Sequence, residues 1–173
     1  MTRRPTAAEL ADLWQLRSLL PQEDVLFTPT YECPDTGPDG KPLGTAMVAM
    51  LLPDPSSFSD MHRLPTDEVW HFYLGDPIEL LLLHADGTDE LVVLGTDVLH
   101  GQRVQTVVRR GTWMGARLRP GGEYGVYGNT MAPGFVPADF EGADAAALIE
   151  RWPHRRELIT ALIRTPNNDS GRP

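Results

Sequence analysis

The strongest constraint on the fold is a series of short apolar segments, separated by turn residues, between positions 45 and 131. Runs rich in Gly, Pro and Asp mark the joints, as at Gly75–Pro77 and Pro120–Gly122. Seven short strands at this spacing are typical of an antiparallel sandwich or barrel. The segments are Thr45–Leu52, Glu68–Leu74, Ile78–His84, Glu90–Leu94, Val104–Arg109, Thr112–Leu118 and Tyr124–Met131. Ile78–Leu83 is nearly all apolar, so we expect that strand to be covered on both faces.

Both ends of the chain have helical patterns. Thr6 and Glu9 form a capping-box pair, and apolar residues then recur at helical spacing, which predicts a helix over residues 7–19 ended by Pro21. A Pro- and Gly-rich loop is expected over residues 33–42. Further helices are predicted over residues 143–152 and 155–163, and the polar residues 165–173 are expected to form a flexible tail.

Composition narrows the class of protein and its partners. A chain of 173 residues with 41% hydrophobic residues suits one globular domain. Its net charge of −9, without a basic cluster, argues against nucleic acid and anionic membrane as partners. The single cysteine, Cys33, cannot form an internal disulfide, and no apolar run is long enough to span a membrane. We therefore expect a soluble cytoplasmic protein.

The segment from Met61 to Gly75 holds the densest group of chemically active side chains. It contains His62, His71 and Glu68 within ten residues, a density that suits a metal site or an acid–base pair. A purely structural role for His62 is the alternative. Because side chains alternate along a strand, Glu68 is expected to face one way and His71 the other, unless a bulge intervenes.

This segment resembles the first sequence motif of the cupins. That motif reads His-x-His, three or four residues, Glu, six residues, Gly, and the chain has His62, Leu64, Glu68 and Gly75 in this order. The sequence Arg109-x-Gly111-x-x-Met114 stands where the second motif has Pro-x-Gly-x-x-His. Further segments are similar to the small cupin subfamily known as DUF985 or "cupin 5": His62–Leu64, Asp67–Pro77, Gly111–Arg117, Ala132–Phe135 and Asp139–Glu141.

The resemblance implies a mainly β fold, a cupin jelly-roll (double-stranded β-helix) barrel with an N-terminal helix and C-terminal helices. It implies a single cupin domain over residues 1–173, with the barrel at about 45–135, a C-terminal helical segment at about 138–164 and a tail at 165–173. A homodimer is also expected, since family members are typically dimeric and the edges of an open jelly roll need cover.

Only two of the four positions that bind the ion in metal-binding cupins carry the usual ligand residues in this chain. Carried over position by position, they are His62, Leu64, Glu68 and Met114. Leucine offers no lone pair, and a thioether is a soft ligand suited mainly to copper. We therefore expect no cofactor. The alternative is a divalent metal held by an atypical set of His62, Glu68 and His71.

Metal-free acid–base chemistry is then the leading hypothesis. The resemblance implies it, because related epimerases use a His base and a Tyr acid without metal. Here His62 is the candidate base, Glu68 orients it, and Tyr73, Tyr124 and Tyr127 are candidate acids; the catalytic set is His62, Glu68, Tyr73 and His71. Candidate substrate-binding residues are Arg63, Trp70, Phe72, Gln105, Trp113, Met114 and Arg117. The alternatives are core packing for the aromatic residues and salt bridges for the two arginines.

Three functions follow from these residues. The first is a metal-independent isomerase, epimerase or lyase acting on a small polar substrate, sugar-like or carbonyl. The second is a non-catalytic cupin that binds a small molecule. The third is a metal-dependent cupin enzyme with an atypical ligand set.

Overall fold

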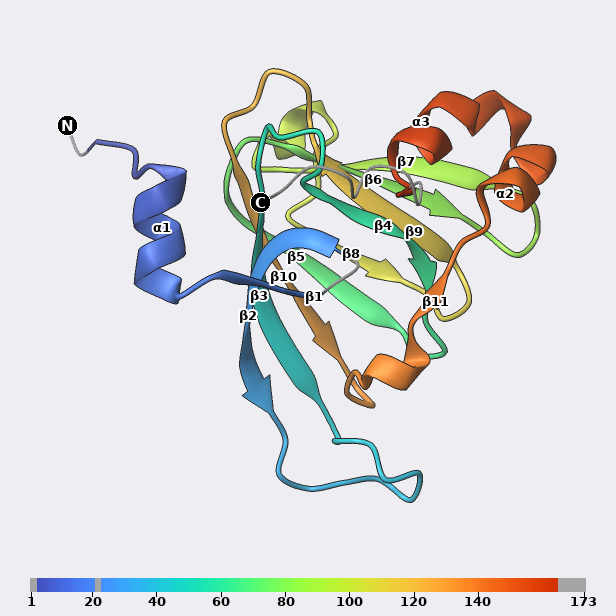
Figure 1. The fold of residues 1–173 in the computed structure, drawn as a ribbon, viewed down its shortest axis with the longest axis horizontal. Coiled ribbons are helices and arrows are strands. Elements are labelled where there is room, and N and C mark those ends of the chain that lie inside the picture. Colours follow the sequence, from blue (N-terminus) through green and yellow to red (C-terminus); the bar gives the residue numbers. More distant parts are fainter. Residues whose placement is uncertain (1–2, 21–22, 165–173) are drawn as a thin grey trace, which may run out of the picture.

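The computed structural model describes residues 3–20 and 23–164. As predicted, the fold is mainly β, and its strands form two antiparallel sheets (Figure 1). The six-stranded sheet has the order β1 (Arg17–Leu20), β2 (Glu23–Glu32), β3 (Thr45–Leu51), β10 (Gly125–Met131), β5 (Glu68–Gly75) and β8 (Gln105–Val108). The five-stranded sheet has the order β11 (Glu141–Gly142), β4 (Phe58–Arg63), β9 (Trp113–Leu118), β6 (Ile78–Leu83) and β7 (Asp89–Leu94).

The main apolar core lies between the two sheets. It is built from inward-facing residues of nearly every strand, including Leu51, Trp70, Leu80, Met114 and Tyr127. The prediction that the β6 strand is covered on both faces is confirmed. Its even-numbered residues join this inner core, and its odd-numbered residues Leu81 and Leu83 join a second cluster beneath the C-terminal helices.

The first helix is shorter than the sequence pattern predicted. Helix α1 (Ala7–Trp14) begins with the expected capping box of Thr6 and Glu9. It ends at Gln15, which adopts a left-handed conformation with φ 52°, and the chain then enters β1, where Arg17 lies opposite Phe27 of β2. Strand pairing therefore replaces the predicted last turns, and Pro21 lies outside the described residues.

Strands β1, β2, β4 and β11 were missed because their sequences lack an apolar alternation. β2 contains three acidic residues and a proline, and Pro29 lies where the register with β3 shifts. β4 reads Phe-Ser-Asp-Met-His-Arg, and its buried Ser59 and His62 look polar in the sequence. β2 is stabilised by pairing with its chain neighbours β1 and β3, and β4 by pairing with the distant β9; a pattern read within one segment does not report either pairing.

The C-terminal helices pack over the outer face of the five-stranded sheet (Figure 1). Helices α2 (Ala145–Arg151) and α3 (Arg156–Ala161) confirm the two predicted helices and are joined by a 3-10 turn, η3 (Pro153–Arg155). Leu148, Trp152 and Ile159 bury their side chains against Phe58 and Leu81. Two further 3-10 turns, η1 (Val98–His100) and η2 (Pro137–Asp139), lie in loops, and the predicted tail at 165–173 lies outside the described residues.

Within residues 3–20 and 23–164, none of the helices is long and apolar enough to cross a membrane.

Candidate functional site

Three buried polar side chains face the interior between the two sheets: His62 on β4, Glu68 on β5 and Asn129 on β10. His62 lies opposite Met114, Glu68 lies opposite Met131, and both methionines belong to the inner core. Asn129 lies opposite Trp70, another core residue. Because cross-strand partners share a face of the sheet, all three polar side chains point inward among apolar neighbours.

Glu68 is a buried carboxyl whose pKa lies close to neutrality. Its side chain accepts a hydrogen bond of 2.7 Å from Trp70 Nε1 and another from the Asn129 amide. Burial raises the pKa of Glu68 to about 7, although the two donated hydrogen bonds pull that pKa downward. At neutral pH both the acid and the carboxylate are therefore populated, as proton transfer requires.

His62 is a neutral imidazole with a defined tautomer. Its Nδ1 lies 2.7 Å from the carbonyl oxygen of Asp60. Since a carbonyl only accepts, we assign the proton to Nδ1, which leaves a lone pair on Nε2. Burial lowers the pKa of His62 to about 4, against the opposing effect of the Asp60 hydrogen bond. The ring of Phe140 stacks on the imidazole at 4.8 Å between centroids.

The Phe140 ring is expected to control the protonation of His62. Replacing Phe140 by Ala exposes the imidazole to water, so the His62 pKa should rise from about 4 toward its ordinary value of 6.5. Titration of the histidine ring signals by NMR measures this change. The His71 pKa, which partial burial lowers, serves as the internal control and should not move. An unmoved His62 pKa would contradict the covering role of Phe140.

The residues around His62 do not suit a divalent metal ion. Leu64 and Met114, at two of the usual ligand positions, are both buried in the inner core. Within the described part of the chain, no three His, Cys, Asp or Glu side chains gather in a way that would hold a metal. One imidazole and one carboxylate fall short of the three or four protein ligands that such ions require. No step of the proposed chemistry therefore depends on a metal.

His71, Tyr73 and Gln105 lie on the outer face of the six-stranded sheet, away from His62 and Glu68. His71 Nε2 lies 2.9 Å from Thr130 Oγ1, and Gln105 Nε2 lies 3.1 Å from His71 Nδ1. Tyr73 is 47% exposed. The predicted alternation of side chains is correct, and no bulge turns His71 inward. The structure thus separates these three residues from the interior, and His71 does not complete a ligand set with Glu68.

The predicted arginines also lie outside the interior. Arg63 forms two hydrogen bonds of 2.7 Å with Glu141, and its guanidinium lies over the ring of Trp113. Arg117 pairs with Glu79 at 2.9 Å. These pairs match the salt-bridge alternative. Three other predicted substrate-binding residues, Trp70, Phe72 and Met114, belong to the inner core. For Trp70 and Phe72 this is the position that the core-packing alternative predicts.

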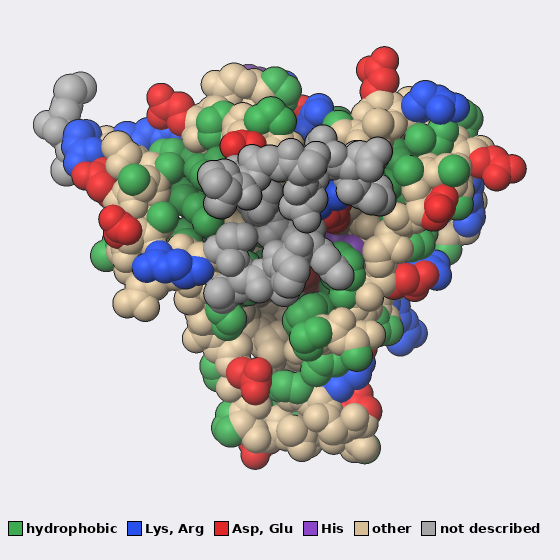
Figure 2. All heavy atoms as spheres, in the orientation of Figure 1, with side chains coloured by type: hydrophobic (Ala, Val, Ile, Leu, Met, Phe, Trp, Pro, Cys, Tyr) green, Lys and Arg blue, Asp and Glu red, His purple; other side chains and the backbone are tan. Residues whose placement is uncertain are grey.

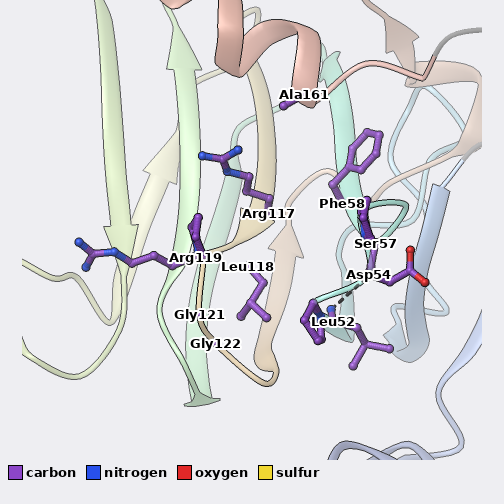
Figure 3. A pocket seen from close by; sticks show the side chains of 13 residues that line it. Leu52, Asp54, Ser57, Phe58, Arg117, Leu118, Arg119, Gly121, Gly122 and Ala161 are labelled. Carbon is purple, nitrogen blue, oxygen red and sulfur yellow. Dashed lines mark hydrogen bonds between the residues drawn. The ribbon is translucent and has the colours of Figure 1, made fainter.

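One hollow on the described surface, of about 420 Å³, lies between the loop before β4 and the turn after β9, beside α3; Figure 3 shows Arg117 and Phe58 among its walls, with Ala161 above them. Another, of about 450 Å³, is nearer to His62. It is lined by Leu64 and Phe140, together with Arg63, Pro65, Gly111, Ala138, Asp139 and Glu141. Because Phe140 lines this hollow and stacks on His62, its ring separates the hollow from the interior.

The structure singles out one of the candidate tyrosines, and it adds two residues to the site that the sequence analysis did not predict. Tyr127 stacks on Trp70 at 4.7 Å and is buried, whereas Tyr124 lies in a different cluster with α1. Asn129 was missed, although alternation along β10 puts it on the face of Tyr127 and Met131, where a polar residue is unusual. Phe140 gave no such signal, because its contact with His62 spans 78 positions of the chain.

Two antiparallel sheets that enclose inward-facing polar side chains define a cupin-type β-barrel. The chain matches the family model described as "Cupin superfamily (DUF985)", cupin 5, over residues 9–143, and so belongs to this family. Comparison with curated proteins gives no significant match.

Solved structures share the fold. A protein from Shewanella oneidensis superposes with a TM-score of 0.82 at 24% identity, covering 93% of this chain and 99% of that one. A hypothetical protein from Leishmania major gives a TM-score of 0.81 at 23% identity, covering 93% and 100%. A cupin 2 domain-containing protein from Halorhodospira halophila gives 0.56 at 12% identity, covering 83% and 85%. At these identities the likeness extends to the fold alone.

Proposed function

We propose that this protein is a metal-independent isomerase, epimerase or lyase that moves a proton on a small polar substrate inside the barrel. The observation that carries the proposal is Glu68, a carboxyl with 6% exposure whose pKa is about 7. A buried carboxyl costs stability when ionised, and such groups are concentrated at sites of proton transfer.

The roles within the site differ from those first predicted. A His62 pKa near 4 makes the imidazole a weak base at neutral pH, so Glu68 takes the role of base and His62 acts as a neutral hydrogen-bond acceptor. The Glu68 carboxylate removes a proton from a carbon beside a carbonyl, and the electron pair moves onto the carbonyl oxygen as an enolate. Return of the proton to carbon completes the isomerisation without any net loss or gain of atoms.

Tyr127 is the candidate acid in this scheme. Of the three tyrosines considered from the sequence, it alone has its ring in the inner core beside Trp70. Its phenol is suited to donate a proton toward the substrate oxygen as negative charge develops there.

Exchange of carbon-bound protons in D2O tests the proposal. Dihydroxyacetone, D-fructose, D-xylulose and pyruvate are suitable probes, followed by proton NMR. We expect the wild-type protein to catalyse exchange on at least one probe, faster as Glu68 ionises through about pH 7. Glu68→Gln should lower the rate by at least about 100-fold, the scale of general acid–base catalysis.

The control for this experiment is Glu90→Gln. Glu90 is a partly exposed residue of the edge strand β7 that is paired with Arg103, so removing its charge should leave the exchange rate unchanged. Exchange that survives Glu68→Gln, or no exchange on any probe, would refute the proposed activity.

A non-catalytic binding cupin is the second candidate, and one observation favours it. His62 and Glu68 are each only 6% exposed, and large apolar side chains surround both. Saturable binding of a probe without any exchange would support this alternative.

A further inference from the structure

Asn129 has a buried oxygen without a hydrogen-bond partner. The side chain is 5% exposed, and its Oδ1 is the one buried side-chain atom that lacks a partner among the described residues. Buried polar atoms are nearly always paired, so an unpaired one calls for a specific explanation. Asn129 stands in the middle of β10, opposite Trp70, where the backbone fixes its direction into the interior.

Rotating the amide does not remove the problem. Glu68 satisfies one end of the Asn129 side chain, by accepting from its NH2 group. If the amide were turned over and Glu68 were protonated, the carboxylic acid would donate to the oxygen, and the NH2 group would lose its acceptor. In either orientation of the amide, its oxygen or its NH2 group therefore lacks a hydrogen-bond partner. The missing partner must therefore come from outside this pair.

The interior offers acceptors and holds no cation. Besides Asn129 Oδ1, the lone pair of His62 Nε2 and the Glu68 carboxyl face it, whereas the Trp70 N–H is already used by Glu68. The buried polar residues of the described chain are Ser57, Ser59, His62, Thr66, Glu68, Thr112 and Asn129, and they include no Lys or Arg.

The two arginines predicted from the sequence to bind substrate are paired with carboxylates outside the barrel. Arg63 and Arg117 are neutralised outside by Glu141 and Glu79. On the face of the molecule in Figure 2, acidic and basic side chains of the described residues are interspersed. An anion entering the interior would lose its hydration without gaining a positive partner.

We infer that the interior site takes an uncharged small molecule with several hydroxyl or N–H donors, that Asn129 Oδ1 anchors one of them, and that carboxylates and phosphates are excluded. The inference rests on the proposed function in so far as that function places the site inside the barrel. Trp70 and Tyr127, whose rings stack, belong to the same inner core as Leu64 and Met114, and apolar neighbours of this kind suit the carbon skeleton of a polyol.

Binding of named probes to the intact protein tests the inference. D-glucose, D-xylose and myo-inositol are the uncharged donors, and D-glucuronate and D-glucose 6-phosphate are their anionic counterparts. Saturation-transfer NMR and calorimetry at millimolar concentrations should detect at least one uncharged probe and neither anion. Asn129→Leu should weaken that binding by about tenfold or more, the effect of one hydrogen bond lost in a buried site.

Thr130→Val is the matched control, because Thr130 is the next residue on the same strand and faces outward toward His71. It should bind the probe as the wild type does. Asn129→Leu also removes the hydrogen bond that the amide donates to Glu68, so the melting temperatures of the ligand-free variant and of Thr130→Val are measured to show that both are folded at the temperature of the binding experiment. If Asn129→Leu does not fold, Asn129→Ala gives the same comparison of affinity.

Several results would overturn the inference. They are equal binding of an anionic probe, unchanged affinity in Asn129→Leu, and no binding of any probe while an ordered water fills the position beside Asn129. Polyol binding without proton exchange would refute the enzymatic proposal and keep this inference. Proton exchange that depends on Glu68 and occurs on pyruvate alone would support the enzymatic proposal and refute this inference.

Discussion

Replacing Glu68 by Gln is expected to stabilise the protein at and above neutral pH. The folded-state pKa of Glu68 is about 7, above the ordinary value of 4.5. The proton held by the folded state therefore supports the fold fully below pH 4.5, and this support is lost as the pH rises through 7. The difference corresponds to about 3 kcal/mol in the free energy of unfolding. The advantage of the Gln variant should grow from pH 4.5 to 7 and then level off.

His62 has the opposite effect in an overlapping range of pH. Its folded-state pKa of about 4 lies below the ordinary 6.5, so its contribution to stability is complete above pH 6.5 and is lost as the pH falls toward 4. In the wild type the two slopes oppose each other between pH 4.5 and 6.5, and their net effect is a nearly flat profile. In Glu68→Gln the His62 slope alone should remain, and stability should fall with acid.

Urea unfolding of the wild type and of Glu68→Gln at a series of pH values from about 4 to 8 measures both effects. Glu90→Gln is again the control, since it removes a carboxylate from the surface salt bridge with Arg103 and should give a curve parallel to that of the wild type. Parallel curves for Glu68→Gln and the wild type would show that the Glu68 pKa is not raised by folding.

A stability cost at Glu68 fits a residue kept for its chemistry. An amide of the same shape would still accept the Trp70 hydrogen bond of 2.7 Å without burying a charge. Natural proteins accept such local losses where a site needs them. The same argument applies to the unpaired oxygen of Asn129, which stands beside the same carboxyl.

The parts of the fold that could be predicted from the sequence are those whose signal is local. The strand at β6 shows itself by an unbroken apolar run, and the N-terminal capping box needs only Thr6 and Glu9. The strands β2 and β4 carry no such signal, because their stability comes from pairing with other strands: β1 and β3 for β2, and the distant β9 for β4. For the same reason the end of α1 was placed too late, since pairing of β1 with β2 overrides helical spacing.

The candidate site shows the same division. Strand alternation correctly separated Glu68 from His71, and the motif positions 64 and 114 do lie in the inner core. The partners of His62 and Glu68 were not predictable in this way. Phe140 and Asn129 reach the site through the closure of the barrel, and the pKa values near 4 and 7 follow from burial, which only the folded chain produces.

Gly75→Ala is expected to lower the free energy of unfolding by at least about 3 kcal/mol, which combines left-handed strain with a steric clash. Gly75 closes the first cupin motif at the end of β5, and its φ of +100° disfavours any residue with a Cβ. An added Cβ would lie 2.3 Å from the carbonyl oxygen of Tyr124. Because that oxygen belongs to the backbone, no side-chain rotation relieves the clash.

Gly121→Ala separates the two causes. Gly121 has a similar φ of +90°, but a Cβ there meets nothing within 4 Å, so only the conformational cost of about 1–2 kcal/mol should appear. Urea unfolding of both variants gives the comparison. Equal losses of unfolding free energy in the two variants would mean that the close approach of residue 75 to the Tyr124 carbonyl oxygen adds nothing to the cost of the substitution. A larger loss at Gly75 would show that the motif glycine fixes the pairing of β5 with β10, the same pairing that sets Asn129 beside Glu68.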